Sequence, residues 1–166
     1  MDAIVFTSNT GFTAQYARLL GEKLGLPVCS LDEAKGTLEE GTEILYLGWL
    51  MAGLVKGYKK AAKRYRIAAV CGVGMGAGGS QTEDVRRNNA IPENTPVFTL
   101  QGGFDYGKLH GINKFMMSTM RRTVGKRLAE QPDKTPEAQD MQELLMHGGS
   151  RVSEENLRPV LEWCGK

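Results

Sequence analysis

The sequence is poor in the residues that most often form metal centres and disulfides. Its 166 residues include three cysteines, far apart at positions 29, 71 and 164, and two histidines. This spacing fits neither a metal site nor a redox pair, so we expect reduced, buried thiols and no metal ligands. No Ser-His-Asp or Cys-His pairing is visible, which argues against hydrolysis and leaves no residue assigned as catalytic.

The chain also lacks long apolar runs and a strong net charge. No stretch is long and apolar enough to span a bilayer, and the first residues lack a signal-peptide pattern, so we expect a cytoplasmic protein. The formal net charge of +2 is a weak field that does not favour nucleic acid as a partner. With 41% apolar and 24% charged residues, the composition fits one globular domain spanning residues 1–166.

What the sequence does contain is a regular alternation of strand-like and helix-like segments. Short apolar runs predict strands at residues 3–8, 28–31, 44–49, 67–72 and 96–101. The segments between them predict helices at residues 14–24, 32–40, 55–65 and 81–89. This alternation predicts an α/β fold with parallel strands, right-handed crossovers and helices on both faces of the sheet.

Residues at the ends of these segments add detail. Gly25 is expected to end the first helix in a left-handed conformation. Ser80, with Glu83 three residues later, predicts a capping box. Thr135 is expected to cap a helix that begins at a proline, and Asn156 to cap the last helix.

The most informative stretch directly follows the first predicted strand and consists of Ser8, Asn9, Thr10, Gly11, Phe12 and Thr13. A strand, a short hydroxyl-bearing turn and a helix N-terminus create an anion site, because unpaired N–H groups and the helix dipole point into the turn. Gly11 lets the backbone approach a ligand closely. No Lys or Arg lies in the turn, so a phosphate would be held by hydrogen bonds and the dipole alone.

The Ser-x-Thr-Gly-x-Thr pattern at residues 8–13 resembles the phosphate loop of flavodoxins, which holds the 5′-phosphate of FMN. The resemblance implies a flavodoxin-like three-layer α/β/α fold with a five-stranded parallel sheet in the order 2-1-3-4-5. It also implies FMN as cofactor, bound at the carboxyl ends of strands one and three. The alternative is an ordinary strand-to-helix turn that Thr13 caps and that binds no ligand.

In the implied fold, the loop after the third strand faces the flavin ring and contains Trp49, Leu50, Met51, Ala52 and Gly53. Trp49 and Met51 are candidates to pack against the ring face. The alternative for Trp49 is a core side chain packed under the next helix. Gly53 can adopt positive φ, which permits the Ala52–Gly53 peptide to flip. Because the loop has no acidic residue, we expect a less negative second reduction step than in an acidic flavodoxin.

Two further segments are expected to border the ring. After the fourth strand, Gly74, Met75 and Gly76 would form a second wall. The G-x-G-x-x-G match in this region does not follow the first strand, so it is not interpreted as a dinucleotide fingerprint. After the fifth strand, Phe104 and Tyr106 are placed where a third wall would form.

Residues 102–150 exceed a minimal five-strand domain and predict a helical insertion before the C-terminal helix. Its main element, a basic helix at 112–128, has three open interpretations: a core helix, an interfacial helix in peripheral contact with a membrane, or a docking face for an acidic redox partner. In layout, this part resembles the flavodoxin-like branch that includes menaquinone-dependent protoporphyrinogen dehydrogenase.

Three functions follow from the resemblance and its departures. The first is an FMN-binding electron-transfer protein serving a redox partner protein or a small electron acceptor. The second is an FMN-dependent oxidoreductase acting on a quinone or porphyrinogen-type substrate, which the extra segment motivates. The third is a module that binds a phosphate ligand on the same fold without redox chemistry. The sequence does not indicate the oligomeric state.

Overall fold

The computed structural model describes residues 1–109, 111, 115, 118, 119, 123 and 135–165. Most of the predicted basic helix at 112–128 lies outside the described residues. Its described members, residues 115, 118, 119 and 123, are in α-helical conformation. In the part of the chain that the structure describes, no helix combines the length and the apolar character needed to cross a membrane.

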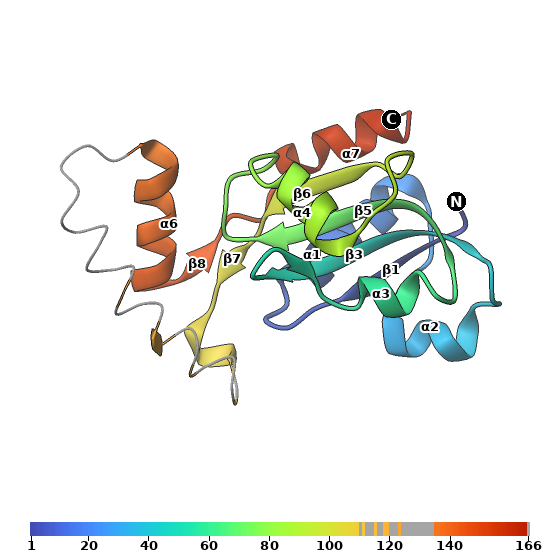
Figure 1. The fold of residues 1–166 in the computed structure, drawn as a ribbon, viewed down its shortest axis with the longest axis horizontal. Coiled ribbons are helices and arrows are strands. Elements are labelled where there is room, and N and C mark those ends of the chain that lie inside the picture. Colours follow the sequence, from blue (N-terminus) through green and yellow to red (C-terminus); the bar gives the residue numbers. More distant parts are fainter. Residues whose placement is uncertain (110, 112–114, 116–117, 120–122, 124–134, 166) are drawn as a thin grey trace.

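A parallel sheet forms the centre of the molecule (Figure 1). Its strands are β1 (Ala3–Thr7), β2 (Val28–Ser30), β3 (Glu43–Met51), β5 (Arg66–Gly74) and β6 (Val97–Gln101). They are ordered β2-β1-β3-β5-β6, which confirms the predicted order of five parallel strands. A short strand, β4 (Leu54–Val55), pairs with the end of β3 in antiparallel fashion.

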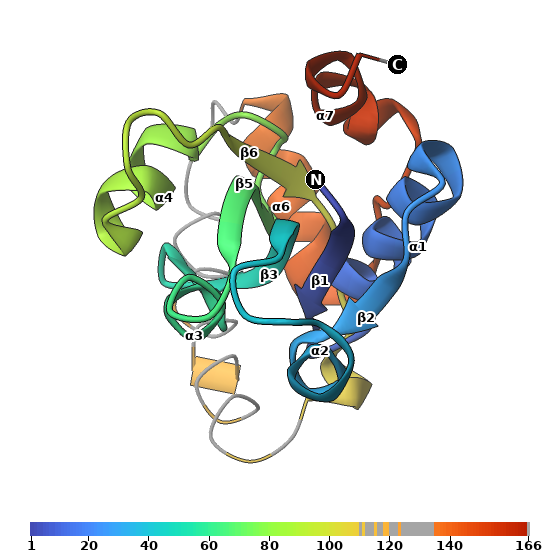
Figure 2. The ribbon, with the colours of Figure 1, turned by 90° about the vertical axis from the view of Figure 1, so that its right-hand side faces the viewer.

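Helices cover both faces of this sheet (Figure 2). On one face lie α1 (Phe12–Leu24) and α7 (Arg158–Trp163), preceded by the 3₁₀ turn Glu155–Leu157. On the other lie α2 (Leu31–Thr37), α3 (Tyr58–Ala61) and α4 (Thr82–Asn89). The result is the flavodoxin-like α/β/α architecture.

The central strands supply side chains to both layers, because neighbouring residues of a strand point to opposite faces. In β3, Tyr46 packs with the α2–α3–α4 layer, whereas Leu45 and Leu47 pack with the α1–α7 layer. All three are fully buried. A sheet buried on both faces explains why the strands read as continuous apolar runs rather than as alternating patterns.

The remaining described elements extend beyond the carboxyl edge of the sheet (Figure 1). They are β7 (Gly103–Phe104), the 3₁₀ turn Tyr106–Lys108, α6 (Pro136–His147) and β8 (Gly149–Ser150). The sequence predicts a helical insertion. The insertion also contains an antiparallel pair of strands, β7 and β8. The Asp140 carboxylate ties α6 to the sheet by accepting from Gln101 Nε2 at 2.6 Å and Arg151 Nε at 2.8 Å.

The predicted basic helix at residues 55–65 is wrong in its bounds, because only Tyr58–Ala61 is helical. Strand β3 continues to Met51, and the chain then turns back so that Leu54 and Val55 pair with it. Gly57 adopts φ 83° before the single-turn helix α3 begins. A Cβ on Gly57 would lie 2.1 Å from Tyr46 Oη, so the chain packs tightly against the sheet here and the helix cannot begin before residue 58.

Two of the predicted helix ends are confirmed and two are wrong. Gly25 ends α1 with φ 67°, and Thr135 Oγ1 caps α6 by accepting from Ala138 N. The capping box at Ser80 is absent: its hydroxyl donates to Ala77 O, and α4 starts one residue later without a side-chain cap. A sequence motif cannot show that a preceding loop carbonyl competes for the same hydroxyl.

The predicted cap at Asn156 is also wrong, because its side chain has a tertiary role instead. Asn156 Nδ2 donates to Tyr16 Oη at 2.8 Å and to Arg151 O at 2.8 Å. Tyr16 Oη in turn donates to Gln101 O, and burial raises the pKa of this tyrosine. The network fastens α1 to the end of β6 and to the segment that follows β8.

Candidate functional site

The loop at residues 8–13 connects β1 to α1 through a left-handed glycine. Gly11 stands at the N-cap of α1 with φ 98°, a conformation that L side chains rarely adopt. Its N–H donates to Ser8 Oγ at 3.2 Å, so Ser8 stabilises the loop from within. The alternative interpretation requires Thr13 to cap the helix. Thr13 instead lies inside the first turn, and Gly11 occupies the N-cap position.

This loop leaves a group of hydrogen-bond donors free. The backbone N–H groups of Asn9, Thr10, Phe12 and Thr13 bond to no described residue. Thr13 is only 2% exposed, and its hydroxyl likewise has no partner among the described residues. Since these amides are free and α1 adds the positive end of its dipole, the loop is suited to bind an anion.

A hairpin between β3 and β4 forms the second part of the site. Ala52 and Gly53 connect the two strands with φ 50° and 73°, as in a type I′ turn. The buried side chain of Asn89, from α4, holds this hairpin in place. Its Oδ1 accepts from Val55 N at 2.9 Å, and its Nδ2 donates to Gly53 O at 2.9 Å.

The hairpin presents Trp49 and Met51 at the carboxyl edge of the sheet. Trp49 is half-buried and belongs to neither core layer, which rules out the core alternative. Lys56 Nζ lies 5.7 Å from the centroid of its ring, a cation–π distance. Leu50, by contrast, packs inward over β5, where a Cβ on Gly72 would approach its side chain to 2.8 Å.

Strand β5 and the glycine-rich loop after it supply the third part. β5 runs to Gly74, so this residue belongs to the strand end rather than to the predicted loop. Met75 and Gly76 follow immediately, and Gln101 Nε2 donates to Met75 O at 3.3 Å. Gly74 leaves room for the side chain of Leu50. A Cβ added at Gly74 would lie 3.1 Å from Leu50 Cδ1.

These three parts open into one cavity of about 760 Å³. All the predicted site residues except Ser8 and Gly11 line it, and those two shape the loop backbone. The volume lies within the range of roughly 300–1,000 Å³ typical of ligand sites. None of the described residues that line this cavity carries a charge. The cavity therefore offers apolar surface, amide groups and hydroxyls.

The extra segment forms a further wall that the sequence indicated only in part. Phe104 lines the cavity as expected, whereas Tyr106 lines a neighbouring hollow instead. Leu109, Phe115 and Met141 also border the cavity, together with Thr119, Thr123 and Gly103. Sequence reasoning missed these residues, because their approach to the sheet edge depends on how β7 and β8 pair.

The titratable groups near the sheet centre are neutral. Tyr46 Oη donates to Lys56 O at 2.8 Å and lies 2.7 Å from Thr7 Oγ1, and burial raises its pKa to about 12. Burial also raises the pKa of the Cys71 thiol, so both stay protonated near neutral pH. Among the described residues, no group of His, Cys, Asp or Glu is arranged to hold a metal ion.

Together, the fold and the cavity define an α/β/α protein with a large cavity at the carboxyl edge of its parallel sheet, where the strand order reverses. Comparisons with protein-family models, with curated proteins and with solved structures found no match. The function of this cavity must therefore be argued from its own residues.

Proposed function

We propose that this chain binds FMN in the cavity at the carboxyl edge of the sheet and serves as an electron-transfer protein. One observation carries the proposal: the donor-rich loop at residues 8–13 and the apolar walls at Trp49 and Met75 open into the same cavity. FMN has the matching two parts, a phosphate at one end and a flat aromatic ring at the other. When bound, it supplies one- and two-electron chemistry.

The residues present fit this cofactor. The free N–H groups of Asn9, Thr10, Phe12 and Thr13 and the Thr13 hydroxyl would hold the phosphate in place of a cation. Such donors, aligned with a helix dipole, stabilise a charged phosphate well. Trp49 and Met51 offer a polarisable surface to the ring. With no acid among the described lining residues, electrostatic repulsion would not disfavour addition of electrons to the ring.

The proposal predicts that FMN binds and stabilises the protein. At an FMN concentration of about 100 times the dissociation constant, binding should add about 2.7 kcal/mol to the free energy of unfolding, which a thermal-shift or urea titration would detect. The bound cofactor should also colour the protein yellow. Riboflavin, which lacks the phosphate, should stabilise it less.

Failure of saturating FMN to shift the transition would contradict the proposal. If a colourless phosphorylated ligand such as AMP stabilised the protein and FMN did not, the non-redox module would replace it. Inorganic phosphate alone should have a small effect, because it occupies the loop and leaves the apolar walls unused.

A second candidate is an FMN-dependent oxidoreductase acting on a quinone or porphyrinogen-type substrate. It is favoured by the wall that the extra segment builds, in which Phe104, Leu109 and Phe115 border the same cavity as the phosphate loop. A simple carrier needs an exposed ring edge and gains little from this additional apolar surface. An enzyme needs room for a second, apolar reactant next to the ring.

The two candidates differ in how Phe115, which is 72% exposed, affects electron transfer. For an enzyme, we expect Phe115→Ala to raise the KM for menadione several-fold, while electron transfer to ferricyanide, which needs no binding pocket, is unchanged. Stopped-flow reoxidation of the photoreduced FMN-loaded protein measures both. Equal effects of the variant on the two acceptors, or menadione reduction no faster than with free FMN, would exclude the enzyme.

A further inference from the structure

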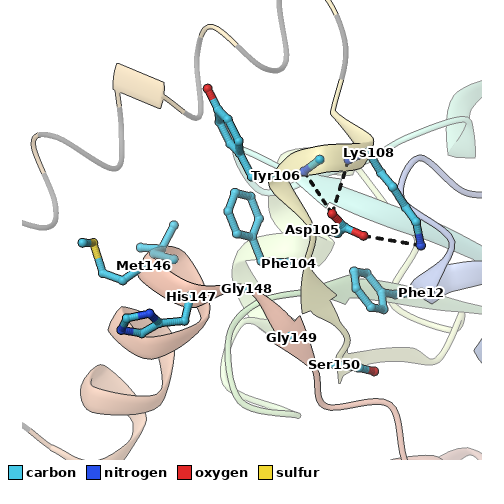
Figure 3. A pocket seen from close by; sticks show the side chains of 12 residues that line it. Phe12, Phe104, Asp105, Tyr106, Lys108, Met146, His147, Gly148, Gly149 and Ser150 are labelled. Carbon is cyan, nitrogen blue, oxygen red and sulfur yellow. Dashed lines mark hydrogen bonds and ion pairs between the residues drawn. The ribbon is translucent and has the colours of Figure 1, made fainter.

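A second cavity lies next to the first and is lined by different chemistry. It has a volume of about 500 Å³ and is bordered by β7, the 3₁₀ turn after it, and the C-terminal end of α6 (Figure 3). Phe12 and Phe104 line both cavities, so these two aromatic side chains form the partition between them. Unlike the first cavity, this one contains charged residues.

The acidic group of this cavity is held by its own turn. Asp105 Oδ1 accepts from Gly107 N at 3.0 Å and from Lys108 N at 3.3 Å, and Oδ2 lies 3.4 Å from Lys108 Nζ (Figure 3). The two amide donors hold one oxygen of the Asp105 carboxylate within the turn. Its role is to shape the turn that carries Lys108.

The basic groups, in contrast, are accessible. Lys108 is 64% exposed on its side chain, and its ion pair with Asp105 is long, so an anion can compete for the ammonium group. His147, in the last turn of α6, hydrogen-bonds to no described residue and lines the cavity. Both side chains can donate hydrogen bonds to an anionic group.

The apolar part of the cavity is aromatic. Phe104 and Tyr106 form a tilted pair with ring centroids 6.5 Å apart, and Phe104 is 5% exposed. Figure 3 shows their rings between the end of α6 and the turn of Asp105. Aromatic rings in this arrangement offer faces and edges to a flat ligand. The cavity thus combines aromatic surface with two hydrogen-bond donors of basic character.

We infer that this second cavity binds a flat aromatic molecule carrying one anionic group, with the aromatic body against Phe104 and Tyr106 and the anion at Lys108 or His147. The site is separate from the cavity proposed for FMN and does not depend on that proposal. A ligand bound here lies one aromatic layer, Phe12 and Phe104, away from the first cavity.

Three naphthalene probes of similar shape test the inference: 2-naphthalenesulfonate, neutral 2-naphthol and cationic 2-naphthylmethylammonium. Isothermal titration of the full chain should give the tightest binding for the sulfonate and the weakest for the ammonium, with about a tenfold spread. Saturating FMN should leave the sulfonate affinity within about twofold. Loss of sulfonate binding in the presence of FMN, or equal affinity for the three probes, would overturn the inference.

Two variants with opposite expected effects locate the anion. Lys108→Gln should weaken sulfonate binding about threefold to tenfold. Asp105→Asn keeps an oxygen for the amides of Gly107 and Lys108 but removes the competing charge, so it should strengthen binding about threefold. A purely structural role of this turn would weaken binding in both variants. Lys59→Gln, an exposed lysine on α3, is the control and should have no effect.

His147→Gln tests the other donor and should weaken sulfonate binding about threefold, with naphthol unaffected. Melting temperatures of all variants show whether each is folded. Unchanged sulfonate affinity in both Lys108→Gln and His147→Gln would place the probe elsewhere and refute the inference, whatever FMN does in the first cavity.

Discussion

Thr13→Val should abolish most FMN binding while leaving the protein as stable as before. Thr13 is 2% exposed and its hydroxyl bonds to no described residue, so a methyl group of nearly the same shape removes no hydrogen bond from the folded protein. A hydrogen bond to a charged group contributes roughly 1.5–3 kcal/mol, so the affinity for FMN should fall roughly 10- to 100-fold. Fluorescence quenching of FMN on titration with protein measures this affinity.

Riboflavin provides the matched control for this variant, because it shares the ring and lacks the phosphate. Its affinity should be nearly the same in the parent protein and in Thr13→Val. The melting temperature of the protein without FMN should not fall. Two results would show that the Thr13 hydroxyl is not a phosphate ligand. One is an unchanged affinity for FMN in the variant, and the other is an equal fall in the affinities for FMN and riboflavin.

Gly57→Ala should be among the most destabilising single substitutions in the chain. Gly57 has φ 83°, and an added Cβ would stand 2.1 Å from Tyr46 Oη and 2.5 Å from Thr7 Oγ1. The left-handed backbone costs an alanine roughly 1–2 kcal/mol, and overpacking adds roughly 1–3 kcal/mol. Loss of the hydrogen bonds that Tyr46 Oη makes with Thr7 and Lys56 would destabilise the protein further. We expect a total loss of at least roughly 3 kcal/mol in the free energy of unfolding, measured in urea.

Gly41→Ala separates the two contributions. Gly41 has φ 80°, almost the same backbone conformation, but a Cβ there would have nothing within 4 Å. It should cost only the backbone strain, roughly 1–2 kcal/mol. Similar losses in the two variants would mean that the packing around Tyr46 yields easily and does not fix the chain between β4 and α3.

The predictions that held depend on residues close together in sequence. Strand β1, the loop at residues 8–13 and helix α1 occur as expected, because an apolar run, a left-handed glycine and an amphipathic segment are each encoded locally. The same is true of the cap at Thr135, whose hydroxyl reaches an amide three residues away. The strand order came from the resemblance, and the structure confirms it.

Two of the predictions that failed depend on contacts between distant residues. The stretch predicted as a helix at 55–65 begins as strand β4, since Asn89 binds Val55 N and Gly53 O from across the molecule. Asn156 donates to Tyr16 Oη, 140 residues away in the chain, instead of capping a helix. In each case a local signal of modest strength gave way to a buried polar group that had to be satisfied.

The sequence by itself determined the alternation of strands and helices, the two-sided burial of the sheet and the donor-rich turn after β1. These follow from patterns that repeat over a few residues, where local backbone preference and apolar spacing act together. Only the tertiary structure decided which segments line the cavity together with the turn at residues 8–13. The pairing of β7 with β8 joins residues 103–104 to 149–150, carries the wall at Phe104 toward the sheet edge and creates the second cavity behind it. Such long-range pairing is selected by the burial of whole surfaces, which no short stretch of sequence specifies.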